Sequence, residues 1–193
     1  NITIDSLHSY NTANVIFLRI GERYEGEKAK LNNVTISNVY AEVPAGKPDA
    51  GYEYEGPVED LPRNISPASI TGLPGQYVTN VTLKNITIVY PGGGNPNYAK
   101  VGTDAKSLNA IPEMPKAYPE FSQFKELPAW GFYIRHAKGI TFDNVTLTAE
   151  KPDYRPAIVL DDVHGGDLEN VTINDPGKKK NEIVVFQSTD IKK

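Results

Sequence analysis

Apolar and polar residues alternate along most of this 193-residue chain, and the alternation recurs in short units with the pattern apolar-x-apolar-x-Asn-apolar-x-apolar. Five stretches carry the pattern: ITIDSLHS (2–9), VTISNVYA (34–41), VTLKNITI (81–88), ITFDNVTL (140–147) and GDLENVTI (166–173). The last departs from it at Gly166, and the first fits in part, with Ser6 in the asparagine position. A period of two residues is typical of a strand with one buried face, so each unit is predicted to be two short strands that meet at a corner.

The corner residue of each unit is expected to have a left-handed backbone. Asparagine adopts that conformation more readily than most other residues with a side chain, and four of the five corners carry it: Asn38, Asn85, Asn144 and Asn170. Seven Asn-x-Ser/Thr triplets occur in the chain, and in a eukaryotic secreted protein they would mark glycosylation sites. Six of the seven lie in or beside the repeat units. We therefore favour a structural role for these asparagines.

A separate apolar strand accompanies each unit. These strands are predicted at VIFLRI (15–20), ASITG (68–72), GFYIRH (131–136), AIVLDD (157–162) and EIVVFQ (182–187). Three strands per turn, repeated about five times, predict an all-β fold, a right-handed parallel β-helix in which each coil pairs with the next. The alternative is a β-sandwich, which would not need a recurring corner asparagine.

Loop-like stretches interrupt the repeat. The corners are 32, 47, 59 and 26 residues apart, and removing the stretches 21–30, 44–66 and 91–128 leaves 22, 24, 21 and 26 residues. Such lengths are in the range of stacked repeats, and long excursions often build the functional face of a solenoid. We expect residues 1–193 to be the C-terminal part of one β-helical domain, with excursions at about 44–66 and 91–128. An open N-terminal coil would allow the segment to self-associate.

Composition excludes several classes of function. The net charge of −4 argues against broad nucleic-acid binding. The chain has no apolar run long enough to span a membrane, and without cysteine it has no disulfide or thiolate chemistry. No cluster of metal ligands, phosphate-binding loop or Ser-His-Asp spacing stands out, so we expect neither a metal nor another cofactor.

The arginines indicate a possible ligand. There are five against fifteen lysines, and each lies in or near one of the separate strands: Arg19, Arg23, Arg63, Arg135 and Arg155. In the strand 15–20 the isoleucines and the leucine take the core face, so Arg19 is expected to point out of the sheet. Arginines stacked on one sheet would form a basic stripe suited to carboxylates, such as those of a pectic chain. The alternative is ordinary pairing with nearby acidic residues: Glu22, Asp60, Asp153 or Asp161.

The opening stretch resembles a segment of polygalacturonase-like family 28 glycoside hydrolases. Arg19-Ile20-Gly21 matches the first two residues of that family's Arg-Ile-Lys motif and departs from it at the lysine. Three later stretches look like the C-terminal half of Bacteroides-type members: VPAGKPDAGYEYEGPVEDLPRNISPASITGLP, YPEFSQFKELPAWGFYIRHAKGITFDNV and RPAIVLDDVH. The resemblance covers essentially the whole chain.

This resemblance implies a secreted or periplasmic bacterial enzyme with a right-handed parallel β-helix, which hydrolyses pectic glycosidic bonds with inversion and without a metal. In the family the catalytic aspartates and a Gly-His-Gly motif precede the arginine motif, and no such motifs precede Arg19. The catalytic residues are therefore expected upstream of this chain, and the segment alone is expected to be inactive. Asp161-Asp162 lies downstream of Arg19, and we interpret it as the end of a strand.

The candidate substrate-binding residues are Arg19, Arg23, Arg135 and His136, and the expected partner is an acidic, pectic polysaccharide. Gly21 in place of the motif lysine leaves open a rhamnogalacturonan or another decorated uronic polymer. A non-catalytic carbohydrate-binding or adhesive β-helix is the main alternative function. A pectate lyase would require calcium-binding carboxylates that this segment does not offer.

Overall fold

The computed structural model describes residues 1–24, 26, 28–46, 64–98, 101–117, 121–124, 126–177 and 182–193. These residues contain ten strands: β1 (Ile2–Tyr10), β2 (Phe17–Arg19), β3 (Asn32–Glu42), β4 (Ala68–Thr71), β5 (Val78–Gly92), β6 (Phe132–Lys151), β7 (Ile158–Asp167), β8 (Val171–Asn174), β9 (Ile183–Phe186) and β10 (Thr189–Lys192). The helical segments among them are α1 (Ala105–Asn109) and the 3₁₀ turn η1 (Phe121–Phe124). The protein is therefore nearly all β, as the alternation predicted.

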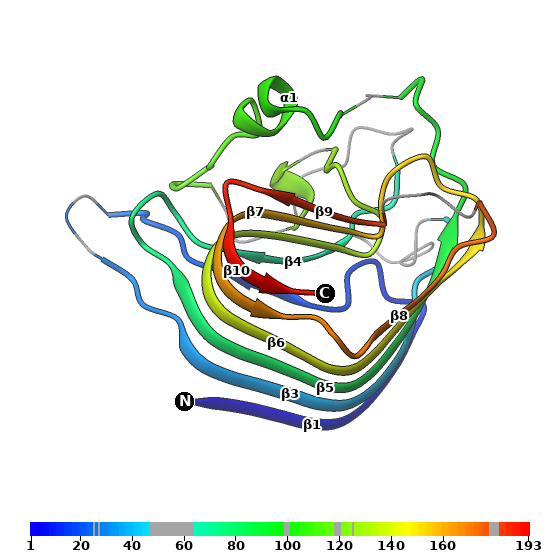
Figure 1. The fold of residues 1–193 in the computed structure, drawn as a ribbon, viewed down its shortest axis with the longest axis horizontal. Coiled ribbons are helices and arrows are strands. Elements are labelled where there is room, and N and C mark those ends of the chain that lie inside the picture. The colour runs from blue at the N-terminus through cyan, green and yellow to red at the C-terminus, as the bar shows by residue number, and fades with distance from the viewer. Residues whose placement is uncertain are drawn as a thin grey trace, which may run out of the picture.

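All nine strand pairs among the described residues are parallel. Strands β1, β3, β5 and β6 lie side by side in that order and curve together, as Figure 1 shows. Strands β2, β4, β6, β7 and β9 pair in the same order along the chain. Parallel pairing throughout excludes the antiparallel sandwich that the alternation alone left open.

The repeat units align with one another in register. Their first positions form one column across the sheet, which runs Ile2, Val34, Val81, Ile140, Gly166. The separate apolar strands align in the same way, through the column Phe17, Ser69, Tyr133, Val159, Val184. Because side chains alternate between the two faces, this register pairs each inward-facing residue of one strand with an inward-facing residue of the next strand.

Three of the four corner asparagines have the left-handed backbone that was predicted. The φ angles of Asn38, Asn85 and Asn144 are 55°, 52° and 59°, and Ser6, in the asparagine position of the first unit, has a φ of 59°. The asparagine side chains form a ladder, in which Asn144 Nδ2 donates to Asn85 Oδ1 at 3.0 Å and Asn85 Nδ2 donates to Asn38 Oδ1 at 2.9 Å. Asn38 Nδ2 in turn donates to Asp5 Oδ1 at 2.7 Å. The corners are thus connected from coil to coil.

The prediction of a left-handed corner at Asn170 was wrong. This residue is not among those with positive φ, and it lies in a turn between β7 and β8 rather than inside one bent strand. Its carbonyl oxygen accepts a hydrogen bond from the backbone N–H of Val145 at 3.0 Å. A turn of several residues changes the chain direction gradually, so no single residue there must adopt the left-handed conformation.

The inward side chains form one core along the stack. Ile36, Leu83 and Phe142, which share a register column, are between 0% and 4% exposed. The corresponding face of β1 is open, with Ile2 44% and Ile4 42% exposed, because no strand among the described residues pairs with its other edge. Nothing in the structure tests the predicted self-association through this coil, which stays a prediction.

A second apolar cluster lies on the outer face of the sheet. Leu108 of α1, Ile111, Phe124 and Leu127 pack there against Tyr133 of β6 and Val159 of β7. The segment between β5 and β6 therefore folds over the outer face, and α1 lies above β7 and β9 in Figure 1. The first predicted excursion, at about 44–66, falls mostly outside the described residues. In the described part of the chain, no helix has the length and apolar character needed to cross a membrane.

Candidate ligand-binding site

Arg19 lies on the outer face of β2, as predicted, but residues 111–117 cover it. Its Nη1 donates to the backbone carbonyl oxygen of Ala117 at 3.5 Å. Its Nη2 donates to the backbone carbonyl oxygen of Met114. Its guanidinium carbon is 5.2 Å from the centre of the Phe124 ring. Burial lowers the pKa of Arg19 from its usual value. Arg19 therefore points out of the sheet and into a loop that the outer apolar cluster holds over it.

Arg135 lies in the same register column as Arg19, two strands further along the sheet, and the same loop covers it. Its Nη1 donates to the Ile111 carbonyl oxygen at 2.8 Å, and its Nη2 is 2.9 Å from Glu113 Oε1. Its Nε is 3.2 Å from Asp161 Oδ2, an ion-pair distance without hydrogen-bond geometry. The predicted column of arginines thus exists for these two residues, and protein carbonyl and carboxylate oxygens contact both of them.

Pairing with nearby acidic residues, the alternative for the arginines, occurs in two places. Arg135 contacts Asp161, and Arg155 Nη2 is 3.0 Å from Asp153 Oδ2 in a pair that is almost fully buried. Arg155 Nη1 also donates to the Ile65 carbonyl oxygen at 2.9 Å, so Arg155 connects the loop between β6 and β7 with the segment before β4. Arg23 is exposed in the turn after β2, and Arg63 lies outside the described residues.

His136 follows Arg135 at a left-handed corner, with a φ of 50°. Its Nδ1 is 2.6 Å from Asp162 Oδ2 and its Nε2 is 3.0 Å from Glu113 Oε1. Burial opposes the charged ring, but hydrogen bonds to Glu113 and Asp162 outweigh it, and the pKa of His136 is raised. The structure therefore brings Arg135 and His136 together in one network. Their role as direct substrate contacts stays a prediction.

The interpretation of Asp161-Asp162 as the end of a strand was wrong, because β7 continues through both residues to Asp167 and bends at Asp162. Asp161 is 2% exposed and accepts a hydrogen bond from Tyr133 Oη at 3.3 Å; burial raises its pKa, against the effect of Arg135. Asp162 has a φ of 56° and also contacts His164 Nε2 at 2.8 Å. Burial would raise the pKa of Asp162, but its hydrogen bonds to the two histidines lower it. Both carboxyl groups thus have partners within the protein.

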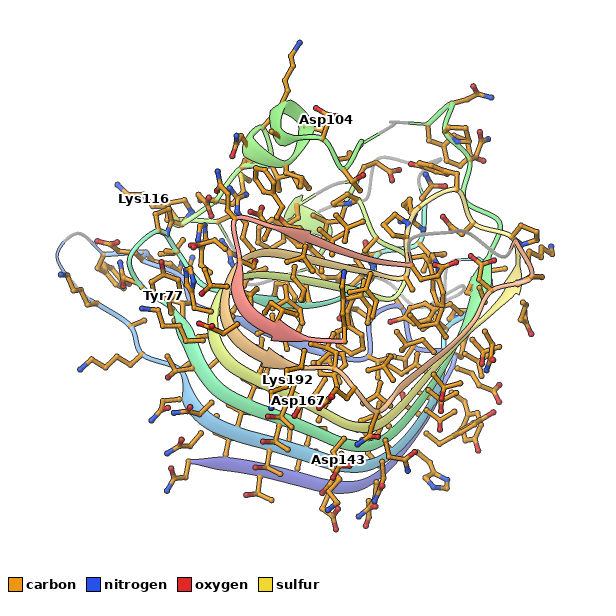
Figure 2. All side chains as sticks on the ribbon, viewed as in Figure 1. Tyr77, Asp104, Lys116, Asp143, Asp167 and Lys192 are labelled. Atoms are coloured by element: carbon orange, nitrogen blue, oxygen red, sulfur yellow. The ribbon has the colours of Figure 1, made fainter. Side chains whose placement is uncertain are left out.

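A cleft of about 510 Å³ opens beside this network, next to the start of β5. Its lining consists of Lys28, Ala29, Lys30, Leu31, Asn32, Gly75, Gln76, Tyr77, Thr79, Asn80, Lys138 and Gly139. Figure 2 shows Tyr77 at the side of the molecule where β5 begins, well away from Asp143 on the outer surface of the curved strands. The described residues that line the cleft include three lysines and no Asp or Glu, so they give it a cationic lining in a protein whose net charge is negative.

Tyr77 connects the cleft with the histidine network. Lys138 Nζ lies 3.9 Å from the centre of the Tyr77 ring. The same ring meets His164 edge-on at 5.7 Å and His136 at 6.4 Å between ring centres. Its hydroxyl group is 3.5 Å from Asp162 Oδ1, and burial, followed by the charge of Asp162, raises the pKa of Tyr77. These contacts fix the ring that forms one wall of the cleft.

A second column of corner residues forms the floor. Asn80 and Gly139 have φ angles of 55° and 66°, and Asn80 Nδ2 donates to Asn32 Oδ1 at 2.9 Å. A β carbon at Gly139 would lie 2.9 Å from Asn80 Oδ1, so glycine at this corner keeps the floor open as well as relaxing the backbone. The floor thus presents amide groups next to the lysines.

The site suits the binding of an anionic, hydroxyl-rich ligand. Ammonium groups supply charge, and side-chain amides can both donate and accept hydrogen bonds. Among the described residues that line the cleft, none is Asp or Glu. In the part of the chain that the structure describes, no group of three or more His, Asp or Glu side chains is arranged to hold a metal ion.

The sequence did not single out the residues of this cleft. Lys28 and Lys30 lie in the stretch 21–30, and Lys138 lies beside a corner glycine, positions that are usual for solvated lysines. The Lys-x-Lys spacing was the one local signal available, and it is weak. Comparisons of the chain with protein-family models, curated proteins and solved structures give no match.

Proposed function

We propose that this chain is the C-terminal part of a pectin-directed, polygalacturonase-like glycoside hydrolase with a right-handed parallel β-helix fold, and that it binds the acidic polysaccharide. The resemblance of the opening and later stretches motivates the family. In-register parallel strands and the ladder of corner asparagines support the fold. The expected location is outside the cytoplasm of a bacterium, where such polymers are found.

The cationic cleft is the observation that carries the proposal. Lys28, Lys30 and Lys138 line one cavity, and no Asp or Glu is among its described lining residues. A uronic acid polymer carries a carboxylate on each sugar. A hydrogen bond between charged partners contributes roughly 1.5–3 kcal/mol, which is about ten- to a hundred-fold in affinity. We therefore assign the main substrate contacts to these three lysines. Arg19 and Arg135 instead bind residues 111–117, the loop that covers the two arginines.

The shape of the cleft also fits sugar binding. Small-molecule sites usually enclose roughly 300–1,000 Å³, and the volume of about 510 Å³ lies within that range. The amides of Asn32 and Asn80 on the floor can pair with ring hydroxyl groups. Lysine acts as a point charge and imposes little geometry, so the cleft would tolerate the different spacings of carboxylates in a decorated polymer.

A non-catalytic carbohydrate-binding β-helix is the second candidate function, and a lysine-lined cleft whose described lining residues include no Asp or Glu favours it. Both candidates predict binding of acidic sugar at the same cleft. They differ in the longer protein, where the hydrolase requires a pair of catalytic carboxylates about 6.5–9.5 Å apart. Release of reducing ends by the longer protein would support the hydrolase, and binding without turnover would support the second candidate.

The binding proposal is tested by calorimetric titration of the chain with trigalacturonate and with neutral galactotriose. We expect binding of the acidic sugar alone, and we expect Lys138→Gln to weaken it by roughly ten-fold or more. Lys84→Gln is the matched control, because Lys84 is an exposed strand lysine that pairs with Asp143 at 3.3 Å, outside the cleft. Equal affinity for both sugars, or equal losses in the two variants, would refute the assignment.

A further inference from the structure

Three cationic side chains fasten residues 111–117 to the sheet. Arg19 and Arg135 donate to backbone carbonyl oxygens of this segment. His136 contacts the segment through the Glu113 side chain, at 3.0 Å from Oε1. An arginine stays protonated throughout the pH range of proteins, whereas histidine changes charge near neutral pH. Of the three, His136 is therefore the contact that pH can alter.

The geometry around His136 requires a protonated ring. Both ring nitrogens face carboxylate oxygens, Asp162 Oδ2 at 2.6 Å and Glu113 Oε1 at 3.0 Å. An ionised carboxylate can only accept hydrogen bonds, so each nitrogen must donate, and a neutral imidazole has one donor alone. If the ring loses a proton, the lone pair of one ring nitrogen faces a carboxylate oxygen, and the two repel each other. The shorter contact is with Asp162, so the contact with Glu113 is the one expected to break.

Two carboxylates face His136: Glu113 from the covering segment and Asp162 from β7. Arg135 of β6 and the Tyr77 ring, before β5, also lie beside it. His164 contacts the other oxygen of Asp162. The two carboxylates favour the cation, and Arg135 and burial oppose it. The pKa of His136 is raised in the balance. Its contribution to stability is therefore complete below the unfolded-state pKa of about 6.5 and is lost as pH rises through the higher folded-state value.

We propose that His136 is a pH-dependent latch, which as an imidazolium ties Glu113 of residues 111–117 to the β7 corner and on losing its proton gives up this contact, so that Arg135 alone pairs with Glu113. Arg19 and Arg135 keep the segment near the sheet at high pH, so the change is a local loosening and not a detachment. His136 also touches the Tyr77 ring, through which the loosening reaches the wall of the cleft. The inference rests on these contacts and does not depend on the proposed function.

The test is hydrogen exchange of the 193-residue chain, followed by mass spectrometry at about pH 6 and about pH 8.5. After correction for intrinsic exchange rates, we expect the protection of amides in 111–117 to fall roughly ten-fold or more at the higher pH, beyond any change in the core strands. His136→Asn should remove this pH step, since asparagine tolerates the left-handed corner but does not titrate.

Two further variants keep the test decisive. Glu113→Gln changes a partly exposed side chain and should also remove the pH step, because an amide can pair with a neutral imidazole. His8→Asn is the matched control, as His8 is exposed on β1, and it should retain the step. Absence of the step in the wild type, or its persistence in either His136→Asn or Glu113→Gln, would overturn the proposal.

Discussion

The asparagine ladder provides a quantitative test of the fold through Asn85. This residue has a φ of 52°, and its side chain donates to Asn38 at 2.9 Å and accepts from Asn144 at 3.0 Å. Replacement by alanine removes both hydrogen bonds and places a β carbon in the left-handed region. Replacement by glycine removes the same bonds but leaves the backbone unstrained. The two substitutions therefore separate the ladder from the corner geometry.

The expected magnitudes follow from these terms. Each hydrogen bond contributes about 0.5 kcal/mol here, at the low end of the usual range because the ladder is solvent-exposed. The left-handed backbone costs alanine roughly 1–2 kcal/mol, and glycine loses roughly 0.5–1 kcal/mol of additional chain entropy. Asn85→Ala should thus lower the free energy of unfolding by about 2–3 kcal/mol and Asn85→Gly by about 1.5–2 kcal/mol. Asn85→Val should cost more than either, since a branched β carbon is least tolerated at positive φ.

Urea unfolding followed by circular dichroism measures these differences. The dependence on urea should stay constant across the series, so that shifts in midpoint report stability. Lys84→Ala is the neighbouring control, and as an exposed side chain that takes no part in the ladder it should stay within about 0.5 kcal/mol of wild type. A glycine variant that is less stable than the alanine variant would show that Asn85 is not a left-handed corner in solution.

Three other outcomes are expected. Arg19→Met should destabilise the chain by about 1–3 kcal/mol in thermal unfolding, because the carbonyl oxygens of Met114 and Ala117 lose a charged donor; an unchanged melting temperature would contradict the covered position of Arg19. Arg155→Met should cost more, about 3–5 kcal/mol, since it leaves Asp153 buried without its partner, and a smaller loss in the same assay would refute this. The 193-residue chain should release no reducing ends from polygalacturonate, and robust release would mean that catalytic residues lie within it.

Much of the fold could be predicted from the sequence because its cause is local. Alternation with a period of two decides which face of a strand is buried, and once Ile36 is inward its partners Leu83 and Phe142 must be inward too. Left-handed corners select asparagine for a reason that acts within one residue. The prediction of a left-handed corner at Asn170 was wrong because a turn takes the place of the sharp corner there. Whether a turn or a corner forms depends on the geometry of the surrounding loop.

The candidate site was largely hidden from the sequence because it depends on distant contacts. Arg19 was correctly placed on the outer face, but the loop over it is held by Phe124 and Leu108, about a hundred residues away. The cleft forms where residues 28–32 meet the turn at Tyr77 and the corner at Lys138. No local sequence pattern predicts which distant segments will meet in this way. Isolated lysines in turns are usually solvated, so they give no signal of a binding site.

The proposed function requires that the cleft between residues 28–32 and the turn at Tyr77 binds acidic sugar. A crystal structure of the chain with trigalacturonate tests it most directly. We expect ordered sugar in this cleft, with a carboxylate oxygen at hydrogen-bond distance, about 3 Å, from the ammonium group of Lys138. Ordered trigalacturonate elsewhere on the protein, with this cleft empty, would contradict it.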